Sequence, residues 1–369
     1  MPELYLKQRK APSGRRPPKK RKDMGPVETF FSGIFPWKGD PVGEAVRKIV
    51  LLAAIITLFT AGFIMLDFYY FRDRQNTAEA QSYAAERDRN RTNDVVTLLL
   101  DDDDDSVGNK STDKNRKAQV LAEYLPFYER NNDFVGWIEL YPYIQMPVVQ
   151  CKDNDYYLKH NFDRMPSENG TIFADYQGPI TADRKPGNII LYGHNLITNN
   201  FFQPLSHYRK EGMEFLRNNY LIDFDTLYDR GKYFVFSVFL ANTSEQHGDV
   251  FDYWNRVDFR SKSDFDSFVA ECLDRSYFYT GVDLEYGDEL LTLSTCDFSI
   301  FSDMRLVVVA RKVRSDEGIV LDTSKFIDNS GYDENGNIKR KMFDAYYINY
   351  ACEWAGRKWD PDYIKDFAG

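Results

Sequence analysis

Three side chains that could carry out acyl transfer lie at the ends of apolar, strand-like runs. Cys296 closes the strand that begins with Leu290 to Leu293, and His194 follows the run Asn188 to Tyr192. Arg305 comes nine residues after the cysteine and opens a Val-rich run. A thiol that attacks a carbonyl needs a proton carrier and a cation for the developing oxyanion, and these residues are of those types. The pattern predicts a thiol acyl-transfer site built at strand ends.

Cys296 also has a plain structural interpretation, because cysteine is among the residue types most often buried. Its neighbours argue against burial. Ser294 and Thr295 before it and Asp297 after it make this strand end polar. We therefore predict an exposed thiol, which is reactive in its ionised form when a cation or a histidine lies beside it.

His194 and Arg305 are preferred as partners of the thiol because of their positions. His194 stands in a Gly-His-Asn stretch that the other three histidines lack, although a histidine that caps a turn would fit the same place. Arg305 opens the strand after the cysteine loop, where its planar guanidinium can face an oxyanion. Arg311 falls on the same strand face, and both it and Arg314 are expected to be solvated surface charges.

These residues need a scaffold of short strands. Eight strand-like runs lie between turn signals, at 135–140, 146–149, 171–174, 188–192, 221–225, 233–240, 290–293 and 305–313. A helix is expected from Arg116 to Arg130, and another from Ser263 to Tyr277, between the sixth and seventh strands. The fold class is therefore mainly β with α additions, as a barrel or a sandwich.

The sequences of these motifs resemble those of the sortases. Among the sortases they are similar to class B, the membrane-anchored cysteine transpeptidases of Gram-positive bacteria. The resemblance covers roughly residues 132 to 313. Beyond the stretches around the cysteine, the histidine and the arginine, it rests on Phe134-Val135-Gly136-Trp137-Ile138, Pro147-Val148-Val149-Gln150 and Asp153-Asn154-Asp155-Tyr156-Tyr157-Leu158. It implies an eight-stranded sortase-type β-barrel with an N-terminal helix and a helix in the connection before the cysteine strand.

The resemblance also implies a function. Cys296 would be the nucleophile, His194 the proton carrier and Arg305 the oxyanion partner. The enzyme would cleave the C-terminal sorting signal of a surface protein and join it to an amine of a peptidoglycan precursor or another surface protein. That chemistry requires no metal and no organic cofactor. Substrate-binding roles are expected for four neighbouring residues, Ser294, Thr295, Asp297 and Asn195.

Two other functions stay open on the sequence. One is a cysteine peptidase that releases the same acyl group to water. The other is a membrane-anchored assembly or binding protein whose site is vestigial. Residues 140–146 and 196–200 differ from the sequences that are common at these places in the family. Because of these differences, the sequence predicts neither the sorting motif nor the acceptor amine.

The N-terminal part of the chain predicts a membrane anchor at residues 49–71. Residues 1–48 have a surplus of Lys and Arg, and residues 49–66 form an uncharged, mostly apolar run. A spanning helix needs about 20 such residues, so the run is just long enough. By the positive-inside rule, the basic arm 1–48 lies in the cytoplasm and the catalytic domain lies outside the cell.

Two alternatives for this region are less favoured. A cleaved signal peptide competes with the anchor, but so long a basic region before the apolar run is unlike a signal peptide. Nucleic acid could attract the basic arm, but the net charge of the whole chain is −10 and its body is acidic. Beside a membrane segment, the arm is expected to face anionic lipid headgroups.

The other domain boundaries follow from composition. Residues 72–117 are polar and acidic and are expected to form mostly a solvated tether, of which a part could continue the membrane helix. The catalytic domain is placed at 118–314. The extension 315–369 carries an aromatic stripe between Met342 and Trp354 on one face of an expected helix, and this stripe is expected to pack on the barrel.

The four cysteines show no metal-type spacing. Cys272 lies on the apolar face of the expected helix at 263–277 and is expected to be a small buried hydrophobe. Pairing of Cys151 with Cys352 stays open, because an extracytoplasmic domain can form disulfides.

Overall fold

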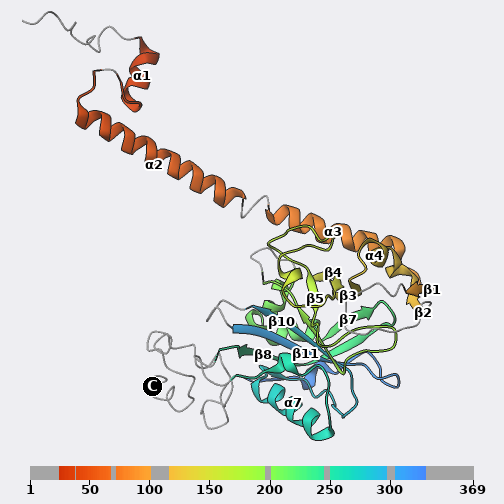
Figure 1. Cartoon of the computed structure of the whole chain (residues 1–369). Coiled ribbons are helices and arrows are strands. Elements are labelled where there is room, and N and C mark those ends of the chain that lie inside the picture. Colours follow the sequence, from red (N-terminus) through yellow and green to blue (C-terminus); the bar gives the residue numbers. More distant parts are fainter. Residues whose placement is uncertain are drawn as a thin grey trace, which may run out of the picture. The chain divides into compact units, whose positions relative to one another are not determined.

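The computed structural model describes residues 25–37, 39–67, 72–100, 116–195, 201–244, 250–296 and 304–329. The chain divides into two compact units, Met1–Asp73 and Arg74–Gly369. Elements are labelled as in Figure 1.

The first unit contains two helices, α1 (Pro26–Ile34) and α2 (Val42–Leu66). α2 has 25 residues and is long and apolar enough to cross a membrane. It contains the whole uncharged run at 49–66 and begins seven residues before it. The aromatic residues 68–71 of the expected anchor lie outside the described residues.

A closed barrel of eight strands forms the body of the second unit, in the order β10-β11-β8-β7-β3-β4-β5-β6. Its strands are β3 (Phe134–Leu140), β4 (Ile144–Val149), β5 (Ile172–Ala174), β6 (Asn188–Tyr192), β7 (Leu221–Thr226), β8 (Lys232–Asn242), β10 (Leu290–Cys296) and β11 (Met304–Lys312). The β4–β5 and β6–β10 ladders are parallel, and the other six are antiparallel. Each of the eight runs predicted from the sequence forms one barrel strand, which confirms the expected fold class.

Alternation along β11 divides its apolar side chains between two cores. Leu306 and Val308 belong to the large cluster that includes the barrel interior. Val307 and Val309 belong to the second cluster, which contains residues of the helix α7 (Lys262–Arg275). Because successive strand residues point to opposite faces, one strand serves both cores.

α7 forms where the sequence predicts a helix between the sixth and seventh barrel strands. Ser261 precedes its first residue and accepts a hydrogen bond from the backbone of Asp264, which caps the helix. Cys272 on its inner face is fully buried, as expected for a core cysteine. The helix therefore covers the outside of the barrel near β8 and β11 (Figure 1).

The segment before the barrel differs from the expected helix at Arg116–Arg130. Residues Arg116–Leu121 form strand β2, which pairs with β1 (Val95–Leu100), and only the 3-10 helix η3 (Ala122–Tyr124) and α4 (Leu125–Arg130) are helical. The helix prediction is wrong for the first six residues because pairing with a distant apolar segment overrides a local pattern.

The expected tether also contains regular structure in its described parts. Residues Arg72–Asn90 form the helix α3, and β1 follows it. Arg87 of α3 forms an ion pair of 3.4 Å with Glu139 of β3. This contact joins α3 to the barrel. The acidic run at 101–105 lies outside the described residues.

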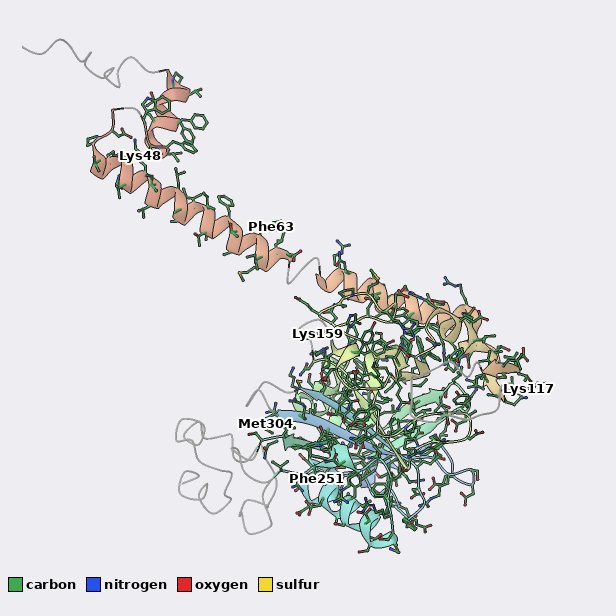
Figure 2. The ribbon with its side chains drawn as sticks, in the orientation of Figure 1. Lys48, Phe63, Lys117, Lys159, Phe251 and Met304 are labelled. Carbon is green, nitrogen blue, oxygen red and sulfur yellow. The ribbon has the colours of Figure 1, made fainter. Side chains whose placement is uncertain are left out.

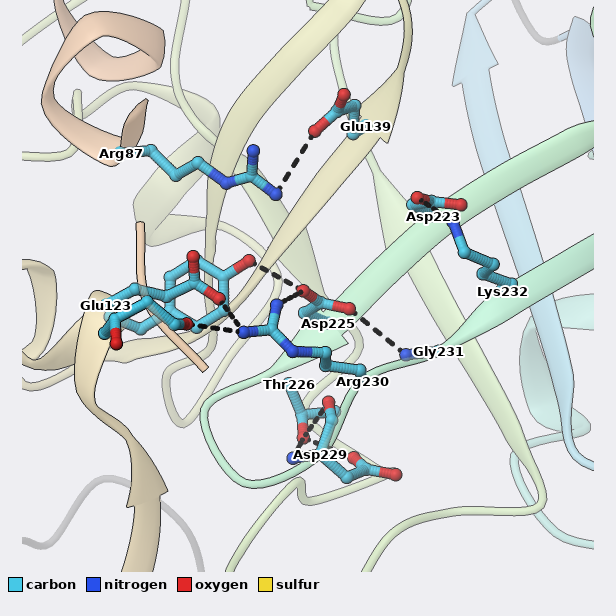
Figure 3. Close-up of polar contacts among 12 residues, drawn as sticks. Arg87, Glu123, Glu139, Asp223, Asp225, Thr226, Asp229, Arg230, Gly231 and Lys232 are labelled. Atoms are coloured by element: carbon cyan, nitrogen blue, oxygen red, sulfur yellow. Dashed lines mark hydrogen bonds and ion pairs between the residues drawn. The ribbon is translucent and has the colours of Figure 1, made fainter. Parts of the chain in front are cut away.

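A cluster of charges, of which two carboxylates are buried, joins the η3 segment to β7 and the turn that follows β7 (Figure 3). Arg230 forms ion pairs with Glu123 of η3 and, at 3.1 Å, with Asp225 of β7. Tyr124 donates a hydrogen bond of 2.8 Å to the same Asp225 carboxylate. Glu123 is fully buried, so Arg230 supplies the counterion that its charge needs there.

Residues after β11 pack against the same unit. Strand β12 (Ile327–Asp328) pairs with β9 (Phe278–Tyr279), and Phe326 is buried. Asn329 donates a hydrogen bond of 2.7 Å to the Ser276 carbonyl. The aromatic stripe at 342–354 lies outside the described residues. Short helices that the sequence did not predict are α5 (Ser206–Lys210) and α6 (Met213–Asn218).

Candidate active site

The last residue of β10 is Cys296, and its partner across the β10–β11 ladder is Arg305. Partners in a ladder carry their side chains on the same face of the sheet. Cys296 is partly exposed, as predicted from its polar neighbours, and it is a free thiol. The cysteine and the arginine are therefore adjacent at one end of the barrel.

His194 reaches the same end of the barrel from the other side of β10. In the parallel β6–β10 ladder, Tyr192 pairs with Ser294. Two residues further along each strand are His194 and Cys296, which places them level with one another. Two hydrogen bonds of 2.7 Å hold this arrangement. Thr295 Oγ1 donates to the Gly193 carbonyl, and Asn195 Nδ2 donates to the Cys296 carbonyl.

The three residues line one hollow of about 310 Å³. Its walls also include Asn154 and Leu158 from the segment before β5, Phe173 of β5 and Tyr192 of β6. Four neighbouring strands, β5, β6, β10 and β11, and one loop thus converge on a site that is open to a substrate.

Hydrogen bonding fixes the orientation of the His194 ring. Its Nε2 lies 2.9 Å from the Leu158 carbonyl oxygen. A carbonyl oxygen can only accept, so Nε2 carries a hydrogen and Nδ1 is the nitrogen left to exchange a proton. The loop that supplies Leu158 therefore sets which nitrogen of the imidazole is available.

A neutral tyrosine lies beneath the cysteine and the arginine. Tyr253 is buried, and its phenol shares a hydrogen bond of 2.7 Å with the Ser294 hydroxyl. Burial raises the pKa of Tyr253 to about 12, against the opposing effects of the Ser294 hydrogen bond and the Arg305 charge. The phenol therefore stays uncharged, and the Arg305 guanidinium is not neutralised by it.

Asp175 fixes two side chains that line the hollow, Asn154 and Tyr192. This carboxylate is buried directly after β5, where it accepts hydrogen bonds from Asn154 Nδ2 at 2.9 Å and Tyr192 Oη at 2.8 Å. Burial, and next the Asp175 charge, raise the pKa of Tyr192 far above its usual range, so this phenol also remains a neutral donor.

Sequence reasoning missed Asp175 and Tyr253 as parts of the site. For Asp175 a signal existed, since it is a carboxylate at the end of a predicted strand, 171–174, beside the Asp153–Leu158 motif. Tyr253 belongs to the short 3-10 helix η7 (Tyr253–Asn255), which only the tertiary fold brings beneath β10.

The expected substrate-binding residues are close to the thiol, but their polar groups bond to the protein itself. The Ser294 hydroxyl shares a hydrogen bond with the Tyr253 phenol, and the Thr295 hydroxyl donates to the Gly193 carbonyl. The Asn195 amide donates to the Cys296 carbonyl. In this geometry they align the strands. Asp297 lies outside the described residues.

The expectation that Arg311 is a solvated charge is wrong. Its side chain is only 2% exposed, and it forms two hydrogen bonds, of 2.6 and 2.9 Å, with the Glu317 carboxylate. It pairs with Leu290 at the opposite end of the ladder from Cys296. The alternation of residues along the strand correctly placed Arg311 on the same face as Arg305. Nothing in the neighbouring sequence predicts the turn that brings Glu317 over it.

Arg314 is also paired. Its guanidinium binds Asp288 and Asp283, each at 2.8 Å.

Of the other described cysteines, neither Cys151 nor Cys272 lines this hollow. Cys151 is a half-buried free thiol that donates to the Asp153 carbonyl oxygen, 3.2 Å from its Sγ. Cys352 lies outside the described residues, so its relation to Cys151 stays untested.

Comparisons with known proteins give a consistent result. The family model for the sortase domain matches residues 144–313. Sortase B of Staphylococcus aureus is 32% identical over 198 residues, which cover 53% of this chain and 77% of that protein. Sortase B of Listeria monocytogenes is 28% identical over 200 residues, which cover 54% of this chain and 77% of that protein.

Solved structures are similar as well. A Staphylococcus aureus sortase B–substrate complex is 31% identical with a TM-score of 0.47, covering 53% of this chain and 87% of that one. A Bacillus anthracis protein similar to sortase B is 28% identical with a TM-score of 0.49, covering 66% of this chain and 97% of that one.

Proposed function

Because this chain belongs to the sortase family and is a sortase B-like cysteine transpeptidase, we propose that it transfers surface proteins through a thioester on Cys296. It cleaves a C-terminal sorting signal and joins the new carboxyl end to an amine. The amine comes from a peptidoglycan precursor or from another surface protein.

In the first half of the reaction, the Cys296 thiolate attacks the carbonyl carbon of the scissile Thr–X peptide bond. The tetrahedral oxyanion faces Arg305, whose guanidinium stays charged and presents several N–H donors. As the C–N bond breaks, the leaving amine takes a proton from the His194 imidazolium, and a thioester remains on the cysteine.

The second half reverses the proton movement. An incoming amine loses a proton to His194 and attacks the thioester, and the thiolate leaves as the new amide forms. The free Nδ1 of His194 suits this double role, because Nε2 is held by the Leu158 carbonyl.

One observation carries the proposal. His194 follows β6, Cys296 ends β10 and Arg305 lies near the start of β11. These strands are adjacent, and the three residues line the same hollow, with the cysteine between the other two. A nucleophile, a proton carrier and a cation on one barrel end are the parts that thiol acyl transfer needs.

We further propose an arrangement in the cell. The basic arm 1–48 is cytoplasmic, residues 49–71 anchor the chain, and the catalytic domain 118–314 acts outside the membrane. The apolar helix α2 supports the anchor, and the charge asymmetry around it supports the orientation. We assign the extension 315–369 to the barrel unit, because β12 pairs with β9 and Phe326 belongs to the core cluster that includes the barrel interior.

Product analysis tests the transfer function. A fluorescent sorting-signal peptide is incubated with the full-length enzyme, with and without oligoglycine or a diamino acid. We expect an acceptor-dependent amide product at the expense of free acid. Release of free acid alone, at an unchanged rate, would show a peptidase. No acylation of Cys296 by any sorting-signal peptide would show a vestigial site.

A further inference from the structure

The first unit carries an apolar surface that nothing in the described structure covers. The residues Val27, Phe30, Phe31 and Ile34 of α1, with Phe35 directly after it, follow the i, i+3, i+4, i+7, i+8 spacing of a single helix face. Phe30 is 64% exposed and Phe31 is 45% exposed. Their rings touch at 5.6 Å between centroids, and Phe31 touches Phe35 at 5.8 Å. The face is thus one continuous aromatic surface.

The other side of α1 is polar and is tied to α2. Ser32 is buried, and its carbonyl accepts a hydrogen bond of 2.5 Å from Lys48 Nζ. The same ammonium donates to Asp40 at 2.5 Å, and Asp40 in turn accepts from the Trp37 backbone at 2.9 Å. The connection between the two helices is therefore folded against the first turns of α2, where Figure 2 labels Lys48.

Lys48 also sets the depth of this arrangement in a bilayer. It is the last charged residue before the uncharged run that begins at Ile49, so it marks the boundary between the polar surface and the hydrocarbon. Because the carbonyl of Ser32 binds the Lys48 ammonium, the C-terminal half of α1 lies at that same boundary.

We propose that α1 is an interfacial helix that lays its aromatic face into the leaflet on the N-terminal side of the anchor. The inference rests on the proposed anchoring by α2. A helix of this kind lies in the membrane plane with its apolar face at the boundary of headgroups and acyl chains. Trp37 in the connection, 38% exposed, is suited to the same depth.

Charge favours lipid over a second protein as the occupant. The stretch Arg15 to Lys22 just before α1 is strongly basic, and anionic headgroups attract such a segment. A protein partner or a second copy of the chain would also cover an aromatic face, and the experiment separates these cases.

The test places a fluorescent amino acid at one position of the full-length protein, with one chain per lipid nanodisc. Position 30 reports the aromatic face, and position 29, on the neighbouring polar face, is the matched control, since Thr29 is exposed as well. Position 56 reports the middle of α2, where Ile56 is exposed. Quenchers are nitroxide lipids, labelled near the headgroup or at the chain end, and aqueous iodide.

We expect shallow nitroxide lipids to quench position 30 and iodide to quench it roughly fivefold less than position 29, because the apolar face of an interfacial helix is withdrawn from water. Phe31→Asp should return position 30 to the iodide accessibility of position 29, whereas Lys22→Gln, which removes one charge of the arm, should leave it withdrawn. Equal iodide quenching at 29 and 30, with position 56 quenched by chain-end nitroxide, would overturn the inference and spare the anchor.

Two other results would also overturn it. Absence of lipid quenching at position 56 would remove the anchor and this inference with it. Protection of position 30 only in nanodiscs that hold two chains would identify a second copy as the occupant.

Discussion

Cys296 and Arg305 are register partners at the last pair of the β10–β11 ladder before the chain crosses from one strand to the other. Directly opposed residues of an antiparallel pair have Cβ atoms about 4.5–5.5 Å apart. The backbone ladder, rather than a flexible loop, therefore sets the separation of the thiol from the guanidinium.

Arg305→Lys should slow acylation on the order of 10²–10³-fold, the usual effect of losing one oxyanion donor, since lysine keeps the charge but loses the planar fork. Single-turnover acylation by a sorting-signal peptide measures it. Arg184→Lys is the matched control, because Arg184 is a half-exposed surface residue paired with Asp258. An equal loss in both variants would leave Arg305 without a special role. Arg311→Lys cannot serve as a silent control, because Arg311 is buried.

Cys296→Ala should abolish turnover and leave the melting temperature nearly unchanged, since the residue is the partly exposed end of a strand. Transpeptidation and thermal unfolding are measured on the same preparation. Cys151→Ala, at another half-buried free thiol among the described residues, should keep activity. If Cys151→Ala were equally inactive, or Cys296→Ala retained substantial turnover, the nucleophile would be misassigned.

Arg311→Met should destabilise the fold by roughly 2 kcal/mol, because it removes two charge-assisted hydrogen bonds from a buried guanidinium to the Glu317 carboxylate. Urea unfolding at neutral pH measures the change. Lys262→Met breaks the exposed ion pair with Asp266 and should cost less than about 1 kcal/mol. Similar losses in the two variants would mean that burial of Arg311 adds nothing to the pair.

Asp229 predicts an acid-sensitive contribution to stability. Burial disfavours its charge, but hydrogen bonds from Lys185, Thr226 and Lys312 outweigh that effect and lower its pKa to about 2. A lowered pKa in the folded state stabilises the fold above the ordinary value of 3.8, and this stabilisation is lost as the pH falls toward 2. The stability difference between the wild type and Asp229→Asn should therefore shrink between pH 4 and pH 2 in urea unfolding.

Asp225 should show the opposite dependence, because burial is the largest effect on its pKa and raises it. Its contribution to stability decreases as the pH rises through its folded pKa. Parallel pH profiles for Asp229→Asn and Asp225→Asn would contradict the two assignments.

Protease added to intact, wall-stripped cells should destroy the domain after Phe71 and spare the arm before Ile49. The excess of Lys and Arg on one side of the apolar run is the reason to expect this orientation. Antibodies against each end of the chain report which part survives. Survival of the catalytic domain with loss of the arm would reverse the proposed topology.

Much of the barrel could be read from the sequence because its strands are short, alternate in polarity and end at turns. The runs at 188–192 and 290–293 predicted where His194 and Cys296 stand, since a strand end fixes a side chain locally. Arg116–Leu121 shows the limit. Its apolar residues fit one face of a helix, yet the segment forms a strand that pairs with β1. The residues between the two strands do not predict this pairing.

Contacts between distant segments explain the other misses. Tyr253 comes beneath Ser294 from 41 residues away, and Asn188 holds Thr292 from 104 residues away. Glu317 is only six residues from Arg311, but a turn decides whether it folds back over the strand. Local patterns carry no information on such pairings, so sequence reasoning gave Arg311 an exposed position.

The parallel β6–β10 ladder also dictates when the reactive centre comes into existence. Cys296 and Arg305 can meet in a local hairpin, whereas Asn195 and the Cys296 carbonyl are 101 residues apart. Long-range pairings are slow because the entropy of closing a long loop is lost before the contacts form. A newly made chain therefore carries its cysteine without a proton carrier until β6 has paired with β10.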